Sequence, residues 1–462
     1  MHDDSAVGLP VAELRAAFRS RSLSPVEVAE SALSRIEEID HLLHAFVHVD
    51  KDETLRQARD AEKRYAAGDD APLLGIPVSV KDAFDVAGWP TTLGSLHHVG
   101  NVASADSGVP RRLREAGAVF VGKTNTAEFG QSATTDNLLG PDTANPWDAA
   151  RTPGGSSGGA AASVAAGMAT VAVGSDGGGS VRIPASFTGL TGMKPTYGLC
   201  RDEGGFRGMT KFVCPGPLAN NASDARTMLE VLSGRGLGTV LERSLTVAYC
   251  PHPENRPVDP AVTVAVADAA KALESLGHRV VERRIPVDGW HAVFGPLVLE
   301  DERRERGHLI AEPEKITEYE YASLRGPARL SQADVDWATA AWTLYRQRIS
   351  DFFLEVDAIL TPTVAVPSFE LGRRPRTIDG KDVDPLWGPF PFTAAFNVAG
   401  TPAVTVPCGL ADGMPVGAQL VTPAHTDDLL LALAAQLEGA LAFDRAPLRG
   451  RLAEYATVSG SR

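Results

Sequence analysis

An apolar stripe at the spacing of an α-helix lies near the start of the chain, in the segment SPVEVAESALSRIEEID. The first residues of this segment, Ser24, Pro25 and Glu27, form a capping box with proline at the first helical position. The stripe consists of small and branched residues, namely Val28, Ala32, Leu33, Ile36 and Ile39. The pattern predicts an amphipathic helix that covers a core.

Short apolar runs that end in polar loops follow this helix. In GIPVSVKD, Ile76, Val78 and Val80 alternate with other residues, which predicts a strand with Lys81 at its end, and AGAVFVGKTNTAEFG repeats the pattern. Further strands are expected in SLTVAYC, VDAILTPTVAV and TPAVTVPCG, and helices in PAVTVAVADAAKALESLG and DDLLLALAAQLEGAL. This alternation predicts an α/β layered fold with a mostly buried sheet. Since no linker interrupts the pattern, we expect one domain over residues 1–462.

Composition narrows the class of protein. With 44% hydrophobic and 22% charged residues among 462, the chain has the make-up of a globular protein. The net charge of −14 argues against nucleic acid as a partner, because phosphate binding needs clustered lysine and arginine. The four cysteines are widely spaced, the first residues are acidic, and no apolar run is long enough to span a membrane. We therefore expect a cytoplasmic protein with no membrane partner.

Two glycine-rich loops, PGGSSGG and DGGGS, each contain serine. Neither is a phosphate-binding P-loop, since no Lys-Ser or Lys-Thr follows the glycines of the first loop, and neither has the full dinucleotide-binding pattern. Gly154, Ser156 and Gly158 match the G-x-S-x-G nucleophile elbow of α/β-hydrolases. That elbow must follow a strand, whereas TANPWDAARTP before it is typical of a loop.

A metal site is not expected. His41, His44 and His48 are close in sequence, but they lack a nearby carboxylate constellation or an H-E-x-x-H pattern. We therefore predict no metal and no cofactor.

The sequence resembles the amidase signature family of serine hydrolases. The resemblance is carried by GIPVSVKD, by the loop PGGSSGG, and by DGGGSVRIPASFTGLTGMKPT, which begins with the second loop. The resemblance runs from about Leu9 to about Ala440, with a signature core at about residues 70–235 and a variable substrate-channel region at about residues 285–396. It implies a three-layer α/β/α fold around a large mixed β-sheet. Gly177 departs from the family, which usually has a side chain there.

The resemblance implies a Ser, cis-Ser, Lys triad, with Ser180 as the nucleophile, Ser156 as the bridging serine after a cis peptide bond, and Lys81 as the base. The family's oxyanion hole maps onto the backbone amides of Gly177, Gly178 and Gly179. A lysine accepts a proton only when it is neutral, so the site must lower the pKa of Lys81 well below about 10.4. Without the serine loops, Lys81 would be interpreted as a solvated surface residue.

Neighbouring polar residues are interpreted as structural. Ser157 is expected to stabilise the turn beside Ser156. Asp176 and Arg182, on either side of the nucleophile, are expected to form an ion pair or to anchor the loop.

The substrate expected is a neutral, bulky small molecule. Of 29 aromatic residues, 14 lie between Trp290 and Phe396, although some of these must fill the core. The prediction is an amide, anilide or carbamate, hydrolysed through an acyl-enzyme, so that the enzyme would include urethanase activity with esterase activity as a side reaction. The candidate substrate-binding residues are Phe129, Gln131, Trp387, Phe390 and Phe392.

Two alternatives remain. One is the glutaminase-type component of a tRNA-dependent amidotransferase, and the other is a catalytically silent binding scaffold. The sequence does not decide the oligomeric state, for which a homodimer is one option.

Overall fold

The computed structural model describes residues 6–238, 241–326 and 330–459. Within these residues the α-helices are α1 (Val11–Ser20), α2 (Pro25–Leu43), α3 (Lys51–Ala66), α4 (Gly108–Glu115), α5 (Gly158–Ala165), α6 (Arg182–Thr188), α7 (Ala222–Ser233), α8 (Pro260–Ser275), α9 (Trp290–Arg306), α10 (Glu318–Arg325), α11 (Gln332–Phe352), α12 (Ala394–Ala399), α13 (Asp427–Leu441) and α14 (Ala446–Ser459). None of these helices is both long and apolar enough to cross a membrane.

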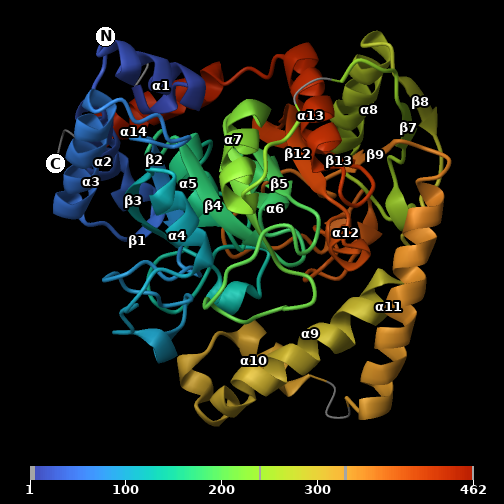
Figure 1. Cartoon of the computed structure of the whole chain (residues 1–462). Helices are drawn as coiled ribbons and strands as arrows, with labels where there is room; N and C mark the ends of the chain where they lie inside the picture. The colour runs from blue at the N-terminus through green and yellow to red at the C-terminus, as the bar shows by residue number, and fades with distance from the viewer. Residues whose placement is uncertain (1–5, 239–240, 327–329, 460–462) are drawn as a thin grey trace.

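An 11-stranded mixed sheet runs through the molecule in the order β1-β3-β2-β4-β6-β5-β12-β13-β9-β7-β8 (Figure 1). Its strands are β1 (Phe46–His48), β2 (Pro77–Lys81), β3 (Val119–Thr124), β4 (Val171–Asp176), β5 (Thr191–Lys194), β6 (Cys214–Ala219), β7 (Thr246–Tyr249), β8 (Arg279–Glu282), β9 (Ala358–Pro362), β12 (Ala403–Ala411) and β13 (Met414–Val421). The strands β3, β2 and β4 are parallel neighbours, so their carboxyl ends lie at one edge of the sheet. A separate hairpin joins β10 (Thr377–Ile378) to β11 (Lys381–Asp382).

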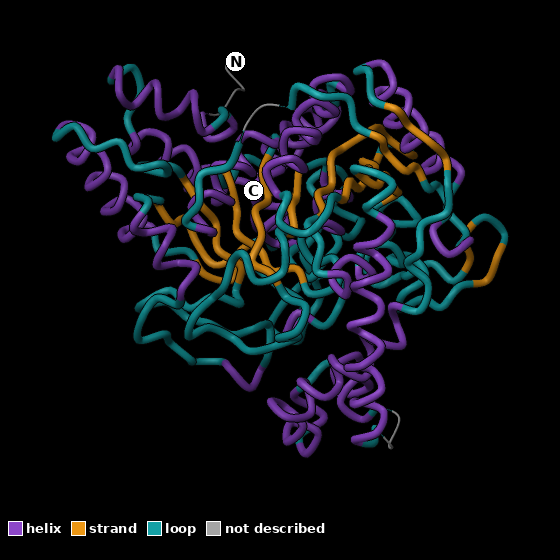
Figure 2. Tube along the Cα trace, turned by 45° about the vertical axis from the view of Figure 1, so that its right-hand side comes forward, coloured by secondary structure: helices purple, strands orange, loops and turns teal. Residues whose placement is uncertain are grey.

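Helices cover both faces of this sheet (Figure 2). On one face α7, α8 and α13 pack beside one another, while α5 and α6 pack together against strands that α7 also contacts from the other side. This α/β/α arrangement confirms the expected fold class, and the buried strand residues join the helices in a large apolar core.

Three helices of the variable region extend away from the sheet (Figure 1). Both α10 and α11 pack against α9, and α12 joins α9 to the main body. A second apolar cluster, which includes Trp290, Phe294 and Phe396, fills this junction. The variable region therefore brings its own core up to the carboxyl edge of the parallel strands.

The elements expected from periodicity are confirmed where the pattern is regular. The capping box at Ser24 opens α2, and Lys81 is the last residue of β2. The strand β6 was not expected, because it contains Pro215 and Pro217. The half of β6 that contains the two prolines pairs only with β4, and β5 pairs with β6 from Leu218 onward. The N–H groups that the prolines lack are therefore not needed for hydrogen bonds to a second neighbouring strand.

Candidate active site

The side chain of Lys81 is positioned by the alternation of strand β2. Ser79 and Lys81 are two residues apart, so they face the same side of the sheet. Ser79 Oγ lies 2.8 Å from Ser163 Oγ in α5, and Lys81 Nζ donates a hydrogen bond of 2.7 Å to Ser156 Oγ just before α5. A second bond of 2.9 Å reaches Ser175 Oγ in the neighbouring strand β4. The expected lysine and bridging serine are thus in direct contact.

Burial sets the protonation of Lys81. Its side chain is 0% exposed, and desolvation lowers its pKa from the usual range to about 7, against the opposing attraction of Asp176. Lys123 and Lys194 are buried to the same extent, but Lys123 pairs with Asp82 and Lys194 donates to a backbone carbonyl. Of these three lysines, Lys81 is the one whose ammonium nitrogen contacts two serine hydroxyls.

The turn that carries Ser156 is held by the loop before it. The peptide bond between Gly155 and Ser156 is cis, as the family resemblance implies. Thr135 Oγ1 donates to Gly154 O at 2.9 Å and accepts from Gly158 N at 2.9 Å, so one hydroxyl fixes both sides of the turn. Ser157 donates from its backbone N to Ser180 O at 3.1 Å, which ties the two serine loops together.

Ser180 is half-buried and follows a glycine that no other residue could replace easily. Gly179 has φ of +129°, and a Cβ atom there would lie 2.2 Å from Thr393 Oγ1. Among the described residues, the hydroxyl of Ser180 makes no hydrogen bond, so its contact with Ser156 is not formed in this structure. Such contacts are often loose before substrate binds.

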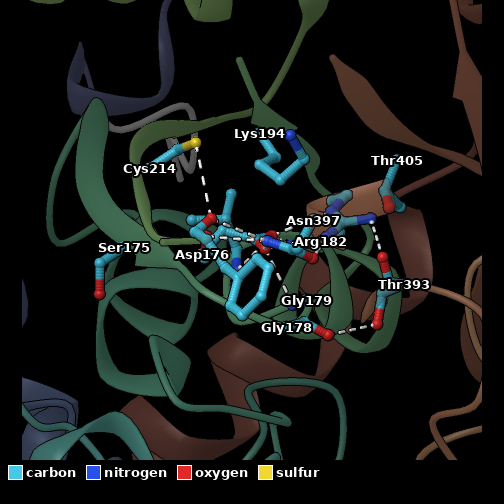
Figure 3. A network of polar contacts seen from close by, with 12 residues as sticks. Ser175, Asp176, Gly178, Gly179, Arg182, Lys194, Cys214, Thr393, Asn397 and Thr405 are labelled. Carbon is cyan, nitrogen blue, oxygen red and sulfur yellow. Dashed lines mark hydrogen bonds and ion pairs between the residues drawn. The ribbon is translucent and has the colours of Figure 1, made fainter. Parts of the chain in front are cut away.

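A buried ion pair anchors the loop that carries Ser180. Arg182 Nη2 lies 2.8 Å from Asp176 Oδ1, and both side chains are 0% exposed. The Arg182 guanidinium holds the pKa of Asp176 well below its usual range, although burial opposes this. Asn397 binds both members of this pair (Figure 3). Gln419, from another distant part of the chain, accepts a hydrogen bond from Arg182. The structural interpretation of Asp176 and Arg182 is consistent with these contacts.

The three glycine amides before Ser180 differ in what they bind. Gly179 N donates to Asp176 Oδ1 at 2.8 Å, so this amide is turned toward the ion pair and away from a substrate. Gly178 O accepts from Thr393 Oγ1 at 2.6 Å, which orients the peptide beside it. Of the expected oxyanion donors, Gly177 and Gly178 are therefore better placed than Gly179. Two cavities lie beside this loop: Gly178 borders the larger one and Gly177 the smaller one.

Two cavities meet at Ser180. The larger, of about 1370 Å³, has Phe294, Trp387 and Ile183 in its wall near the nucleophile. The smaller, of about 600 Å³, contains Lys81 and Ser156 and has a polar rim that includes Arg201, Asp202, Glu203 and Arg207. Gly130, Ser180 and Met209 border both cavities.

The expected substrate-binding residues are divided by the structure. Phe129 lines the smaller cavity, and Gln131 and Trp387 line the larger one. The expectation for Phe390 and Phe392 is corrected, because they are 0% and 2% exposed and pack into the main core instead. Of the three aromatic residues expected in this segment, only Trp387 lines a cavity.

Several residues at the site were missed by sequence reasoning. Ser175 was not singled out, although it directly precedes Asp176 in a strand that ends at the glycine loop. Met209 and Phe294 come from segments without a motif. Asn397, a polar residue within the apolar segment TAAFNVAG, was the detectable signal, since a buried amide needs partners.

Comparison with known proteins identifies the family. The model of the Amidase family matches residues 27–431. This chain belongs to the Amidase family. The amidase is 36% identical to a putative amidase of Mycobacterium tuberculosis, over 91% of the chain and 90% of the relative. It is 33% identical to an acylamidase of Rhodococcus erythropolis (93% and 95% covered), and 34% identical to a glutamyl-tRNA(Gln) amidotransferase component of Chromohalobacter salexigens (95% and 97% covered).

Solved structures agree with this assignment. A bacterial aryl acylamidase of the amidase signature family superposes with a TM-score of 0.84 at 26% identity, covering 98% of this chain and 99% of the other. A crystal structure of an amidase gives a TM-score of 0.88 at 29% identity, covering 94% and 100%. The amidase is therefore an amidase signature enzyme, a hydrolase that acts on amides.

Breaking the buried ion pair should lower the free energy of unfolding of this amidase. Replacing Arg182 by Met leaves the Asp176 carboxylate buried without its cation, so we expect the free energy of unfolding to fall by about 3–5 kcal/mol. Arg373→Met is the matched control, since its pair with Glu370 is 80% and 58% exposed and should matter by no more than about 1 kcal/mol. Urea titrations of both variants measure this, and equal losses would contradict the anchoring role.

Proposed function

We propose that this enzyme hydrolyses the C–N acyl bond of a neutral, bulky amide, anilide or carbamate through an acyl-enzyme on Ser180, with esters as minor substrates. The observation that carries the proposal is the hydrogen bond of 2.7 Å between Ser156 and a wholly buried lysine whose pKa is about 7. A lysine with that pKa is substantially neutral near pH 7 and is able to act as a base. No step of this mechanism calls for a cofactor.

The proton path follows from these contacts. Neutral Lys81 takes the proton of Ser156 as Ser156 takes that of Ser180, and Ser180 Oγ attacks the substrate carbonyl. The amides of Gly177 and Gly178 stabilise the oxyanion that forms. Ser156 then donates a proton to the leaving nitrogen, the C–N bond breaks, and Lys81 returns a proton to Ser156. Water repeats the sequence on the acyl-enzyme and releases the acid.

The two cavities support an assignment of the two halves of the substrate. The leaving nitrogen must face Ser156, which lines the smaller cavity, because Ser156 gives it a proton. The acyl group then points into the larger cavity, beside Phe294 and Trp387. Hydrolytic water takes the place of the amine, and the polar rim of the smaller cavity suits its entry.

The identity of the acyl group is supported by the rings around it. Trp387 lies edge-to-face with Phe294 at 5.9 Å and with Trp290 at 5.7 Å, so the rings form a fixed apolar wall. Similarity to an acylamidase and to an aryl acylamidase supports an aryl or alkyl amide. The four cysteines are free and buried, which supports the cytoplasmic location we propose.

Glutamine hydrolysis within an amidotransferase is the second candidate. Arg374 lines the larger cavity, and a guanidinium there offers a carboxylate a bidentate partner. Its hydrogen bonds go to the hydroxyls of Ser132 and Thr134, with Asp136 close by. Relatives that are components of amidotransferases support this alternative.

The nucleophile is tested by covalent labelling. Ser180→Ala should abolish labelling by a fluorophosphonate, because it removes the attacking oxygen. Ser157→Ala is the control, since the Ser157 hydroxyl contacts only the backbone of Ser175 in the described hydrogen-bond network. A labelled Ser180→Ala protein together with an unlabelled Ser157→Ala protein would reverse the assignment.

The proposed role of Lys81 as the base is tested by the pH dependence of kcat/KM. The pKa of Lys81 is about 7, and its active form is the neutral amine, so kcat/KM should rise from about pH 6 to pH 8 and then level off. Lys81→Met should lower kcat by about 10³-fold or more and abolish this rise. Rates measured from pH 5 to 9, with circular dichroism to check folding, provide the test.

Chelation gives an independent check on the same mechanism. EDTA should leave the rate unchanged, because the lysine and serines carry every proton transfer. Activity lost in EDTA and restored by zinc would contradict the assignment of Lys81.

The substrate class is tested by comparing kcat/KM for an aryl amide with kcat/KM for glutamine, the substrates of the two candidate functions. We expect kcat/KM for an aryl amide to exceed that for glutamine, because the wall beside Ser180 is aromatic. Arg374→Gln should change the value for glutamine more than the value for the aryl amide, since only glutamine carries a carboxylate. A higher kcat/KM for glutamine would favour the amidotransferase function instead.

A further inference from the structure

The larger cavity follows one face of helix α9 away from Ser180. Phe294 marks the end near the nucleophile, because its Cζ lies 3.4 Å from the position a Cβ would take on Gly178. Val298 and Glu302 follow at intervals of four residues, and both line the cavity. Eight residues at 1.5 Å each place Glu302 about 12 Å along the helix from Phe294. Helix α9 runs in this direction toward α10 (Figure 1).

Glu302 is a buried carboxyl group that its neighbours only half satisfy. It is 1% exposed, and Oε2 accepts a hydrogen bond of 2.5 Å from Ser323 Oγ in α10. Within the described parts of the chain, Oε1 has no hydrogen-bond partner. Buried polar atoms are rarely left in this state, and Glu302 is one of the residues that line the larger cavity.

The nearby arginine does not meet this need. Arg306 Nη2 is 4.0 Å from Glu302 Oε1, beyond hydrogen-bond distance. Arg306 is instead held through Nε by Glu320, at 2.9 Å, and by the ring of Phe129, at 4.6 Å from its centroid, while Nη1 and Nη2 have no hydrogen-bond partner among the described residues. Burial raises the pKa of Glu302 and raises that of Glu320 to about 7.

We propose that Glu302 binds a second amide or carbamate group at the far end of the acyl chain of the substrate, about 12 Å along helix α9 from Phe294. This inference rests on the proposed function. An amide group fits either form of Glu302, because its N–H donates to a carboxylate and its C=O accepts from a carboxylic acid. The apolar side chains of Phe294, Val298 and Leu299 lie between the two ends and suit a hydrocarbon spacer. The substrate class is thus a two-ended amide or carbamate.

Two p-nitroanilides with ten-carbon acyl chains test the proposal, one ending in a methyl group and one in a primary carboxamide. The wild-type enzyme should have the higher kcat/KM for the carboxamide, mainly through KM. Glu302→Leu should reduce this preference about tenfold or more, because it removes the polar partner. Glu302→Gln should retain most of it, since its amide also donates and accepts.

Glu305→Gln is the matched control, with the same charge change one turn further along α9 and outside the cavity lining. It should keep the wild-type preference. If Glu302→Leu fails to fold, the wild-type preference alone still decides, and a ratio of one or less overturns the proposal. An unchanged preference in Glu302→Leu also overturns it.

The acetyl p-nitroanilide, too short to reach Glu302, separates the two proposals. If the acetyl p-nitroanilide is hydrolysed and the enzyme does not prefer the carboxamide over the methyl-ended p-nitroanilide, only the proposed role of Glu302 is overturned. Absence of hydrolysis for all three, with no fluorophosphonate labelling of Ser180, overturns the proposed function itself.

Discussion

The buried pair of Asp176 and Arg182 is the interaction on which the site depends. Asp176 ends strand β4 and Arg182 begins helix α6, so the pair closes the loop that carries Ser180. The Asp176 carboxylate also binds the amide of Gly179, and Asn397 reaches it from helix α12 (Figure 3). Two charges in a dry interior are stable only with such complete hydrogen bonding. The loop that carries Ser180 is therefore held by the centre of the sheet and by helix α12 together.

The Asp176 carboxylate also affects the pKa of Lys81. Burial favours neutral Lys81, while the negative charge of Asp176 favours the ammonium form. Desolvation is the larger of the two effects, and it brings the pKa of Lys81 to about 7. One carboxylate thus acts both on the loop that carries Ser180 and on the pKa of Lys81. Structural and chemical roles are linked here through electrostatics.

The segment at about residues 285–396 packs against this fixed centre. Its helix α9 brings Phe294 to the nucleophile loop and continues past it, while Trp387 closes the wall from a segment almost a hundred residues later. The loop at Glu128 to Gln131 is tied to α10 through Glu128, whose carboxylate accepts two bonds of 2.7 Å from Thr317. Both cavities are therefore shaped by contacts between the signature core and the helices that extend from it.

The sequence by itself determined the layered fold, the strand that ends at Lys81, and the two serine loops, because hydrophobic periodicity and glycine-rich turns are local properties. Tertiary structure decided what these residues touch. Whether a lysine is neutral depends on burial by distant segments, and Lys81, Lys123 and Lys194 look alike in sequence while their partners differ. Phe390 and Phe392 were misassigned, and Ser175, Met209 and Asn397 were missed, for the same reason. The direction of a side chain in a loop, and the partner it meets, are set by packing between residues far apart in the chain.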